Sequence, residues 1–253
     1  MTHAPALVVD PRFCGPRLSG NGGWTSGALA ARLDGLAAPW PTVSVTLHAP
    51  PPLGVPLAVR VDGASVVLER DGARVATATA VDHVPTPVAA VPADVARAAE
   101  AAYPGLHHSP FPHCFVCGPA RAEGDGLRIF TGPVRDDPAG SARMAATWTP
   151  HPSIAGEPGL ADLPSTWAAL DCAGGWAGGL AGRAMVLGRL TVRVGSLPVI
   201  GEEHVVVGEA RERQGRKTLT ATTLYDASGR PIACSEQIWI AVDPTHFEGP
   251  AAD

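Results

Sequence analysis

The run LPSTWAALDCAGGWAGGLAG, residues 163–182, decides the fold prediction. Apolar residues recur in it at three-residue and four-residue spacing, as at Trp167 and Leu170, and this spacing predicts a largely buried helix over residues 163–181. Asp171 is the only charged residue of the run. An ionised carboxylate is costly to bury unless hydrogen bonds compensate, and desolvation raises its pKa. The predicted helix therefore carries a carboxyl group that needs an explanation.

Two interpretations of Asp171 remain open at this level. In the first, the carboxyl group is desolvated and acts as a general base or nucleophile, because burial is one way in which proteins tune such groups. In the second, it faces solvent or accepts hydrogen bonds from the backbone amides of a neighbouring loop, and its role is structural. The helix pattern alone favours neither interpretation.

Composition excludes several classes of protein. The 253 residues carry a formal net charge of −5, so the chain lacks the basic surface typical of nucleic-acid-binding proteins. Its start, MTHAPALVVDPRF, lacks the basic and apolar segments of a secretory signal, and no apolar stretch reaches membrane-spanning length. The five cysteines are an odd number at irregular spacing, which indicates reduced thiols. A cytoplasmic protein without a nucleic-acid or membrane partner is expected.

An internal repeat divides the chain into two units. Gly22-Gly23-Trp24 opens an Ala- and Leu-rich run that predicts a helix to about Leu36, and Gly174-Gly175-Trp176 lies in the matching run of the second half. In both halves a glycine-containing turn joins two strand-like segments, at Arg70-Asp71-Gly72 and at Arg213-Gln214-Gly215. The predicted boundaries are 12–82 for the first unit, 83–113 for a Pro-rich linker with one short helix over 93–102, and 114–242 for the second unit.

The second unit has the clearer pattern of elements. One long apolar helix followed by antiparallel strands implies an α+β unit in which the sheet wraps around the helix. The strands of this unit are predicted at residues 126–131, 141–149, 186–195, 203–212, 216–225 and 231–241.

A helix enclosed by a curled antiparallel sheet, with an acid on that helix, resembles the hotdog fold. The segment Cys114-Phe115-Val116-Cys117-Gly118, together with Ala169-Leu170-Asp171-Cys172, resembles hotdog acyl-CoA thioesterases of the phenylacetate-pathway type. The tandem arrangement is similar to acyl-CoA thioesterase II, in which two hotdog units lie in one chain. The resemblance covers most of both units. It implies a double hotdog that hydrolyses an acyl thioester and needs no metal or organic cofactor, coenzyme A being part of the substrate.

The same resemblance assigns site residues. Asp171 falls on the helix acid that activates water or attacks the thioester, and Gln237 falls on a glutamine that helps to hold the water. The family's strand hydroxyl falls near Gly188, which has no hydroxyl to supply. Trp167, and His151 in the loop before the helix, complete the residues expected at the substrate in this unit.

The first unit is expected to line the acyl pocket without carrying out the chemistry. Asn21-Gly22-Gly23 resembles the glycine-rich start of a helix whose backbone amides hold the developing oxyanion. A close helix–sheet contact explains these glycines equally well. The repeat places the position equivalent to Asp171 near Ser19, so the first unit has no acid for a second site.

The cysteines are not expected to bind a metal. Cys114 and Cys117 form a C-x-x-C motif, but structural zinc sites usually combine two such ligand pairs, and no second cysteine pair is present. Cys172, beside Asp171 and without an indicated histidine partner, is expected to pack in the core.

A second function remains open beside hydrolysis. A fold does not determine a function, so a non-catalytic acyl-binding or acyl-CoA-binding protein, or a ligand sensor, is the alternative. The edges of the predicted sheets would also allow a homo-oligomer.

Overall fold

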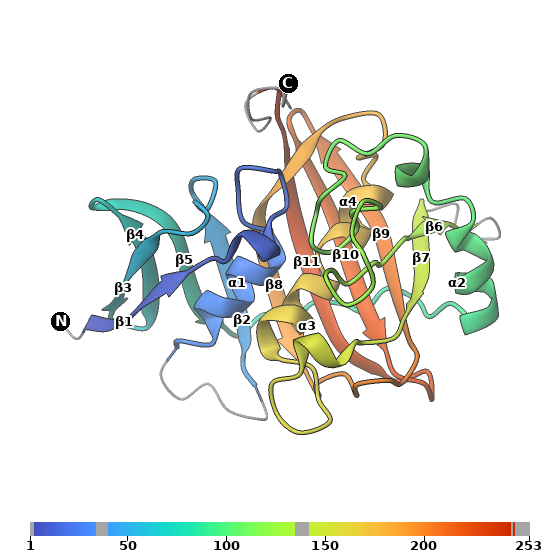
Figure 1. Cartoon of the computed structure of the whole chain (residues 1–253), viewed down its shortest axis with the longest axis horizontal. Helices are drawn as coiled ribbons and strands as arrows, with labels where there is room; N and C mark the ends of the chain where they lie inside the picture. The colour runs from blue at the N-terminus through green and yellow to red at the C-terminus, as the bar shows by residue number, and fades with distance from the viewer. Residues whose placement is uncertain (1–2, 34–39, 135–141, 244, 246–253) are drawn as a thin grey trace.

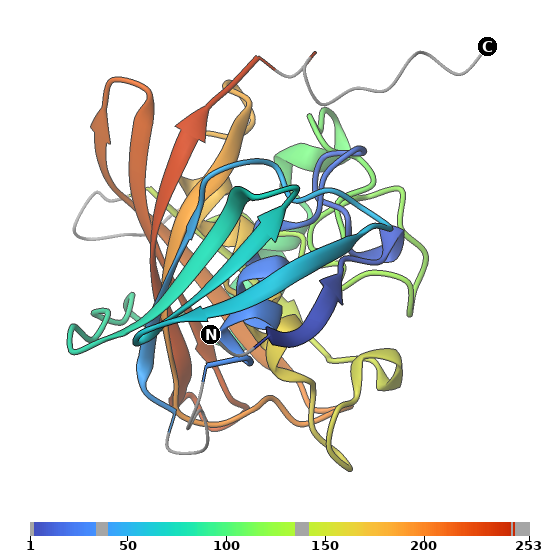
Figure 2. The same ribbon diagram turned by 90° about the vertical axis from the view of Figure 1, so that its left-hand side faces the viewer.

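One antiparallel sheet of eleven strands spans the part of the chain that the computed structural model describes, residues 3–33, 40–134, 142–243 and 245. Its strand order is β1-β3-β4-β5-β2-β8-β11-β10-β9-β7-β6 (Figure 1). The sheet curls around the helices α1, α3 and α4 (Figure 2). The strands are His3–Val8 (β1), Thr42–Leu47 (β2), Pro56–Asp62 (β3), Ser65–Arg70 (β4), Ala73–Val81 (β5), Gly132–Pro133 (β6), Arg143–Trp148 (β7), Met185–Val194 (β8), His204–Gln214 (β9), Lys217–Tyr225 (β10) and Pro231–Ala241 (β11).

The strand order repeats outward from the central pair of strands. β2 pairs antiparallel with β8, and the order continues through β5, β4, β3 and β1 on one side and through β11, β10, β9 and β7 on the other. In each half a strand, a short 3-10 helix and an α-helix precede four further strands. These helices are η1 (Pro11–Phe13) and α1 (Gly22–Ala30) in the first half, and η3 (Pro152–Ile154) and α3 (Leu163–Ala169) in the second. The α+β prediction is confirmed by this arrangement.

The glycine landmarks of the predicted repeat do not occupy equivalent places. Gly22 begins α1, whereas the helix at the same place in the second half begins at Leu163. Gly174-Gly175-Trp176 lies instead in the following helix, α4 (Cys172–Ala177). The two Gly-Gly-Trp segments are therefore alike in sequence and different in structural position.

The position equivalent to Asp171 also changes. The two helices are capped at their N-termini by Asn21 and Asp162. Counting forward from these caps matches Asp171 with Ala30 rather than with a residue near Ser19. The first half still has no carboxylate at that place.

α1 and α3 pack closely against each other across the boundary between the halves. A Cβ atom at Gly27 would lie 2.7 Å from the Cβ of Trp167 and 2.8 Å from the Cα of Pro164. At Gly23 it would lie 2.9 Å from the Cα of Ala168. A close-packed interior has no room for atoms at such distances, so glycine permits this approach of the two helices.

The prediction of one helix over residues 163–181 is wrong, because two helices occupy this run. Leu170 and Asp171 separate α3 from α4, and Asp171 has φ −80° and ψ −78°. The carbonyl of Leu170 accepts a hydrogen bond from the buried side chain of Gln237, a partner outside the helix. The second of these helices, α4, ends at Ala177, before the predicted end at residue 181. Gly179 follows it with a φ of +96°, a conformation that favours glycine and does not continue a helix.

The prediction of a strand over residues 126–131 is also wrong. Arg128 in this segment has a φ of +56°, which interrupts a strand, and the backbone bonds to the preceding loop, where the Leu127 amide donates to the Phe115 carbonyl at 2.8 Å. β6 begins only at Gly132. At the other end of the chain, β1 precedes residue 12, where the first unit was predicted to begin, and pairs with β3.

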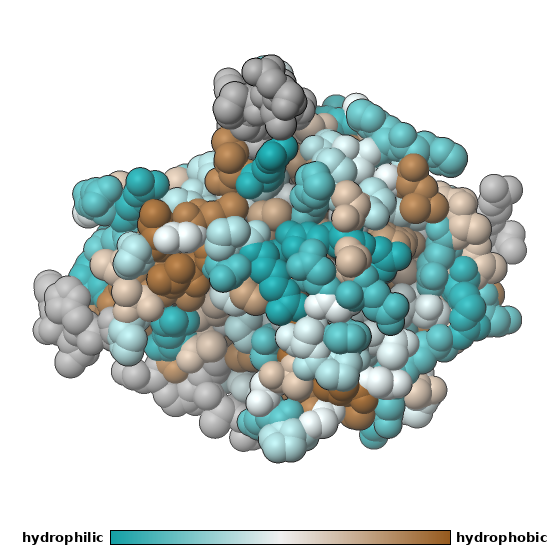
Figure 3. Space-filling view, in the orientation of Figure 1, coloured by the Kyte–Doolittle hydropathy of each residue, from teal (hydrophilic) through white to brown (hydrophobic). Residues whose placement is uncertain are grey.

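The segment between the halves packs first against β7, β9 and β10 and then enters the core, where Tyr103 contacts Trp176. Its short helix is α2 (Ala93–Glu100), which packs on β7, and η2 (Pro104–Leu106) follows it. Residues 34–36 of the predicted first helix and residue 141 of a predicted strand lie outside the described residues. In the face shown in Figure 3, hydrophilic side chains cover the centre, and the apolar side chains form separate clusters. No helix in the described ranges has the length and hydropathy needed to cross a membrane.

Gly208 offers a test of the packing between the sheet and α4. A Cβ atom there would lie 2.3 Å from the carbonyl carbon and oxygen of Ala173. Gly208→Ala is therefore expected to lower the free energy of unfolding by about 1–3 kcal/mol, the usual cost of overpacking. In the control, Gly182→Ala, the added Cβ meets no atom within 4 Å. Urea unfolding compares the two, and equal stability would contradict the packing.

Candidate active site

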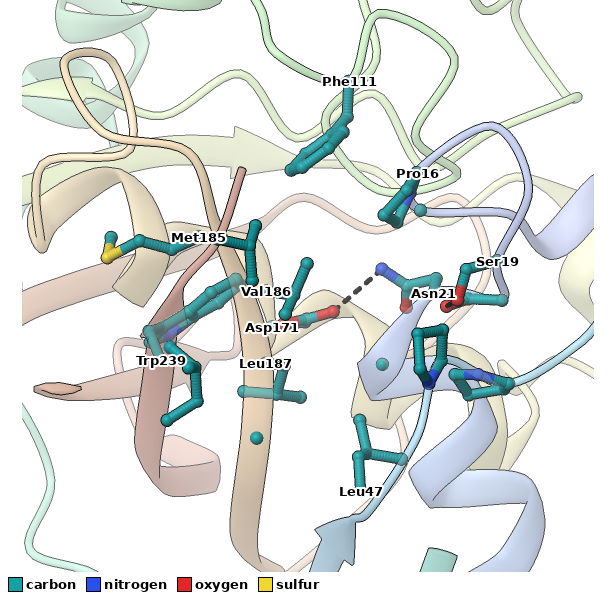
Figure 4. Close-up of a pocket in the computed structure, with 18 of the residues that line it drawn as sticks. Pro16, Ser19, Asn21, Leu47, Phe111, Asp171, Met185, Val186, Leu187 and Trp239 are labelled. Carbon is teal, nitrogen blue, oxygen red and sulfur yellow. Dashed lines mark hydrogen bonds between the residues drawn. The ribbon is translucent and has the colours of Figure 1, made fainter. Parts of the chain in front are cut away.

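A pocket of about 270 Å³ lies between the two halves (Figure 4). The first half contributes the loop before α1 and the connection after β2, and the second half contributes the break between α3 and α4 together with β8 and β11. Most of its lining is apolar and includes Leu47, Phe111, Met185, Leu187 and Trp239. A pocket of this kind suits the apolar part of a small molecule.

Asp171 is the carboxylate of this pocket. Its side chain is 2% exposed, and its Oδ2 accepts hydrogen bonds from Nδ2 of Asn21 at 2.8 Å (Figure 4) and from the backbone N–H of Gly23 at 2.9 Å. Its Oδ1 has no hydrogen-bond partner among the described residues. One oxygen therefore holds the side chain in place, and the other is buried without a partner in the described part of the chain.

Burial is the main cause that raises the pKa of Asp171 to about 7, and the electrostatic interaction with Cys114 acts in the same direction. The hydrogen bonds from Gly23 and Asn21 act in the opposite direction, because they stabilise the charged form. The expectation that Asp171 faces solvent is excluded by this burial. A carboxyl group with this pKa is suited to accept and return a proton near neutral pH.

Asn21 orients Asp171 with a side-chain amide whose oxygen and nitrogen both form hydrogen bonds. Its Oδ1 accepts a hydrogen bond from the Trp24 amide at 2.8 Å and so caps α1, while its Nδ2 donates to Asp171. Asparagine is among the preferred residues at this capping position. The capping role of Asn21 therefore fixes the position of the amide group that donates to Asp171.

The two glycines after Asn21 have different roles. The N–H of Gly23 is donated to Asp171, and a Cβ there would lie 2.7 Å from the Cβ of Asp171, so Gly23 is a close contact and its amide is not available to an oxyanion. Gly22 lines the pocket, and no hydrogen bond of the described residues uses its N–H. The expected pair of oxyanion amides is reduced to one candidate, that of Gly22.

Gln237 supports the helix break and does not line the pocket. Its Oε1 accepts hydrogen bonds from Thr220 Oγ1 at 2.7 Å and from the Trp239 indole N–H at 2.8 Å. Its Nε2 donates to the Leu170 carbonyl and to Thr222 Oγ1. Because these contacts saturate the amide, Gln237 positions Leu170, the neighbour of Asp171, instead of reaching the pocket.

Gly188, the residue nearest to the position predicted for a strand hydroxyl, lies at the pocket but has no hydroxyl group. Gly188 on β8 lines the pocket, and a Cβ there would meet Ile240 Cγ1 at 2.8 Å. Thr191, which lies further along the strand, donates to Ser44 Oγ at 2.9 Å across the β2–β8 pair. The hydroxyl groups nearest to the amide of Gln237 are those of Thr220 and Thr222 on β10, which the sequence did not indicate.

Two predicted substrate residues lie elsewhere. Trp167 is 2% exposed and packs against Gly27 in the contact between α1 and α3, outside the pocket lining. His151 is exposed, and its Nδ1 accepts a hydrogen bond from the Ser153 amide at 3.1 Å, which caps η3. It borders a separate surface depression.

No protein-family model and no curated protein sequence matches the chain. Solved structures do match. A protein of unknown function with a hotdog fold from Alicyclobacillus acidocaldarius superposes with a TM-score of 0.60, at 16% identity over 96% of this chain and 93% of its own. The chain adopts the hotdog fold.

Two further hotdog-like neighbours are similar in extent. A candidate thioesterase II from Thermobifida fusca has a TM-score of 0.59 at 15% identity, covering 94% of this chain and 92% of its own. The tesB protein of Mycobacterium avium subs paratuberculosis has a TM-score of 0.54 at 13% identity, covering 88% of each chain. At such low identity these likenesses establish the fold and not the chemistry.

Three cysteines also line the pocket, a location that the sequence did not predict for them. Cys114, Cys117 and Cys172 line it together with Asp171, and their sulfur atoms lie within 4.8 Å of one another. Hydrogen bonds from Cys114 and Cys172 hold the pKa of Cys117 well below its ordinary value. The C-x-x-C spacing and the cysteine beside Asp171 were visible in the sequence, but only the hotdog fold brings them together.

Gln237→Leu tests the support of the helix break. Leucine fills a similar volume but leaves the Leu170 carbonyl and the Trp239 indole without their partner, and each buried unsatisfied group costs about 1–3 kcal/mol. The free energy of unfolding is therefore expected to fall by at least about 2 kcal/mol. Gln214→Leu, at an exposed glutamine on β9, is the control. Equal urea midpoints for the two variants would show that the network contributes little.

Proposed function

We propose that the chain hydrolyses an acyl thioester, with acyl-CoA as the substrate class. The observation that carries the proposal is the free Oδ1 of Asp171, buried in an apolar pocket whose lining also includes Gly22 with its unused N–H. These are the two groups that addition of water to a thioester carbonyl requires: a proton acceptor and a donor to the developing oxyanion. The likeness to thioesterase II-type structures supports the same class of reaction.

In the proposed reaction the acyl chain lies against the apolar walls of the pocket, and its carbonyl oxygen faces the N–H of Gly22. Water attacks the carbonyl carbon as Asp171 Oδ1 takes its proton. The tetrahedral intermediate collapses, the C–S bond breaks, and the thiolate leaves with the proton returned by Asp171. The products are a carboxylic acid and a free thiol.

Asp171 as a nucleophile is the second form of the same proposal. Attack by Oδ1 on the carbonyl carbon would break the C–S bond, expel the thiolate and leave an acyl anhydride on Asp171; water would then hydrolyse the anhydride and supply the proton of the thiol. Label found in Asp171 after a single turnover in ¹⁸O-labelled water would identify the nucleophilic form. Direct attack places the label only in the product acid, whereas hydrolysis of the anhydride at the Asp171 carbon would place it in the protein.

One observation favours the alternative of acyl binding without turnover. The side chain of Gln237 is saturated by contacts away from the pocket, and no described hydroxyl group hydrogen-bonds to Asp171. A binding protein would retain the pocket and need no group to orient water. Release of thiol from a panel of acyl-CoA esters decides between the two functions, since a binding protein gives affinity without thiol release.

Asp171→Asn tests the proposed chemistry. The amide has nearly the same shape but does not accept the proton, so kcat is expected to fall by about 100- to 10,000-fold. Asp162→Asn is a matched control, because asparagine caps a helix as well as aspartate does and Asp162 lies outside the pocket lining. Far-UV circular dichroism monitors folding. Unchanged turnover in the Asp171 variant would remove this carboxyl group from the reaction.

Gly22→Pro tests the oxyanion donor, with Gly22→Ala as its control. Proline is favoured at the first position of a helix, where it removes the N–H and adds its ring, and Asn21 already has φ −59° and ψ 131°, which suit a residue before proline. Alanine keeps the N–H while placing a Cβ 2.9 Å from the Cβ of Leu187. The kcat of the proline variant is expected to be about 100- to 1000-fold below that of the alanine variant. Equal kcat values would exclude this donor.

A further inference from the structure

Three buried thiols meet beside the pocket from two distant parts of the chain. Cys114 and Cys117 lie in the loop that precedes β6, and Cys172 is the first residue of α4. Their residues are 3%, 2% and 5% exposed, and all three cysteines are free. The sulfur atoms of Cys114 and Cys172 are 3.7 Å apart, and all three sulfurs lie within 4.8 Å of one another.

This spacing is close to that of a tetrahedral zinc–thiolate centre. A zinc–sulfur bond of about 2.3 Å places two sulfur ligands about 3.8 Å apart. Thiolates are soft ligands, and sites built from them favour zinc over hard cations such as magnesium or calcium. We propose that Cys114, Cys117 and Cys172 bind one zinc ion, with the fourth coordination position open to the pocket.

The loop that carries the first two ligands is set by the protein itself. The amide of Gly118 donates to the Cys114 carbonyl at 2.9 Å, and a Cβ at Gly118 would lie 2.5 Å from that oxygen. The hydroxyl of Tyr103 donates to the Cys117 carbonyl at 2.7 Å. These contacts hold the C-x-x-C turn, so both thiols are positioned before any metal binds.

Polar groups around the cluster suit a charged centre. Nδ2 of Asn21 lies 3.9 Å from the sulfur of Cys114, and donors of this kind support metal-bound ligands. Zinc binding displaces the protons of the three thiols into solvent. A zinc ion with three thiolates keeps one negative charge, so a neutral ligand such as water suits the fourth position.

The zinc proposal departs from the sequence expectation for a physical reason. The C-x-x-C motif alone supplies two ligands, and the sequence contains no second cysteine pair. The third ligand is instead a single residue, Cys172, which the helix break brings to the loop. The proposal rests on the sulfur geometry and holds whether or not the pocket hydrolyses thioesters.

Zinc titration of the full chain tests the proposal. The protein is reduced, stripped of metal with a chelator, and titrated with zinc in competition with a chromogenic chelator. One equivalent per chain is expected to bind with submicromolar affinity, and cobalt in its place is expected to give thiolate-to-cobalt charge-transfer bands. A wild-type chain that binds no zinc, or whose cobalt complex lacks these bands, would overturn the proposal.

Cysteine variants assign the ligands. Loss of a hydrogen-bond partner behind a ligand costs about 10- to 100-fold in metal affinity, so Cys172→Ala or Cys117→Ala, which remove a ligand itself, are expected to cost at least about 100-fold. Cys234→Ala is the matched control, since this thiol is also buried but lies outside the cluster. Equal losses in all three variants, or zinc binding unchanged in the cluster variants, would contradict the assignment. The wild-type cobalt spectrum remains decisive if a variant fails to fold.

Discussion

The burial of one carboxylate constrains much of this molecule. Asp171 lies at the boundary between two halves of a hotdog protein, and its charge is tolerated there because Asn21 and the Gly23 amide donate to it from the other half. Those donors require the start of α1 to lie directly against α3. The close approach in turn requires glycine at position 23, where any Cβ would overlap Asp171. These two hydrogen bonds and the glycine contacts together hold the start of α1 against α3 beside the pocket.

The break between α3 and α4 serves the same carboxylate. In a continuous helix Asp171 would have regular helical geometry. Instead the side chain of Gln237 donates a hydrogen bond to the carbonyl of Leu170, and the chain changes direction there. Oδ2 then points at its donors while Oδ1 remains unpaired. The cost of burying the polar network around Gln237 is offset because its amide is saturated with partners. The same turn brings Cys172 to the cysteines of the neighbouring loop.

The two halves share an order of elements and contribute different groups to the pocket. Ala30 occupies the place that Asp171 has in the second half, so the first half has no acid of its own there. It supplies the amide of Asn21 and the glycine backbone instead. The two halves thereby line one pocket with different side chains, and function depends on such side chains and not on the fold.

The sequence by itself determined the α+β architecture and most strands of the second half, because alternation, glycine turns and helical spacing are local signals. It also indicated Asp171, since a single charge in an apolar run is visible without coordinates. It did not reveal the helix break, β1, or the saturation of Gln237. Each of these depends on contacts between residues far apart in the chain. Only the tertiary structure decided that residue 21 meets residue 171 and that Cys172 joins Cys114 and Cys117, because packing of the two halves, and not local spacing, creates those distances.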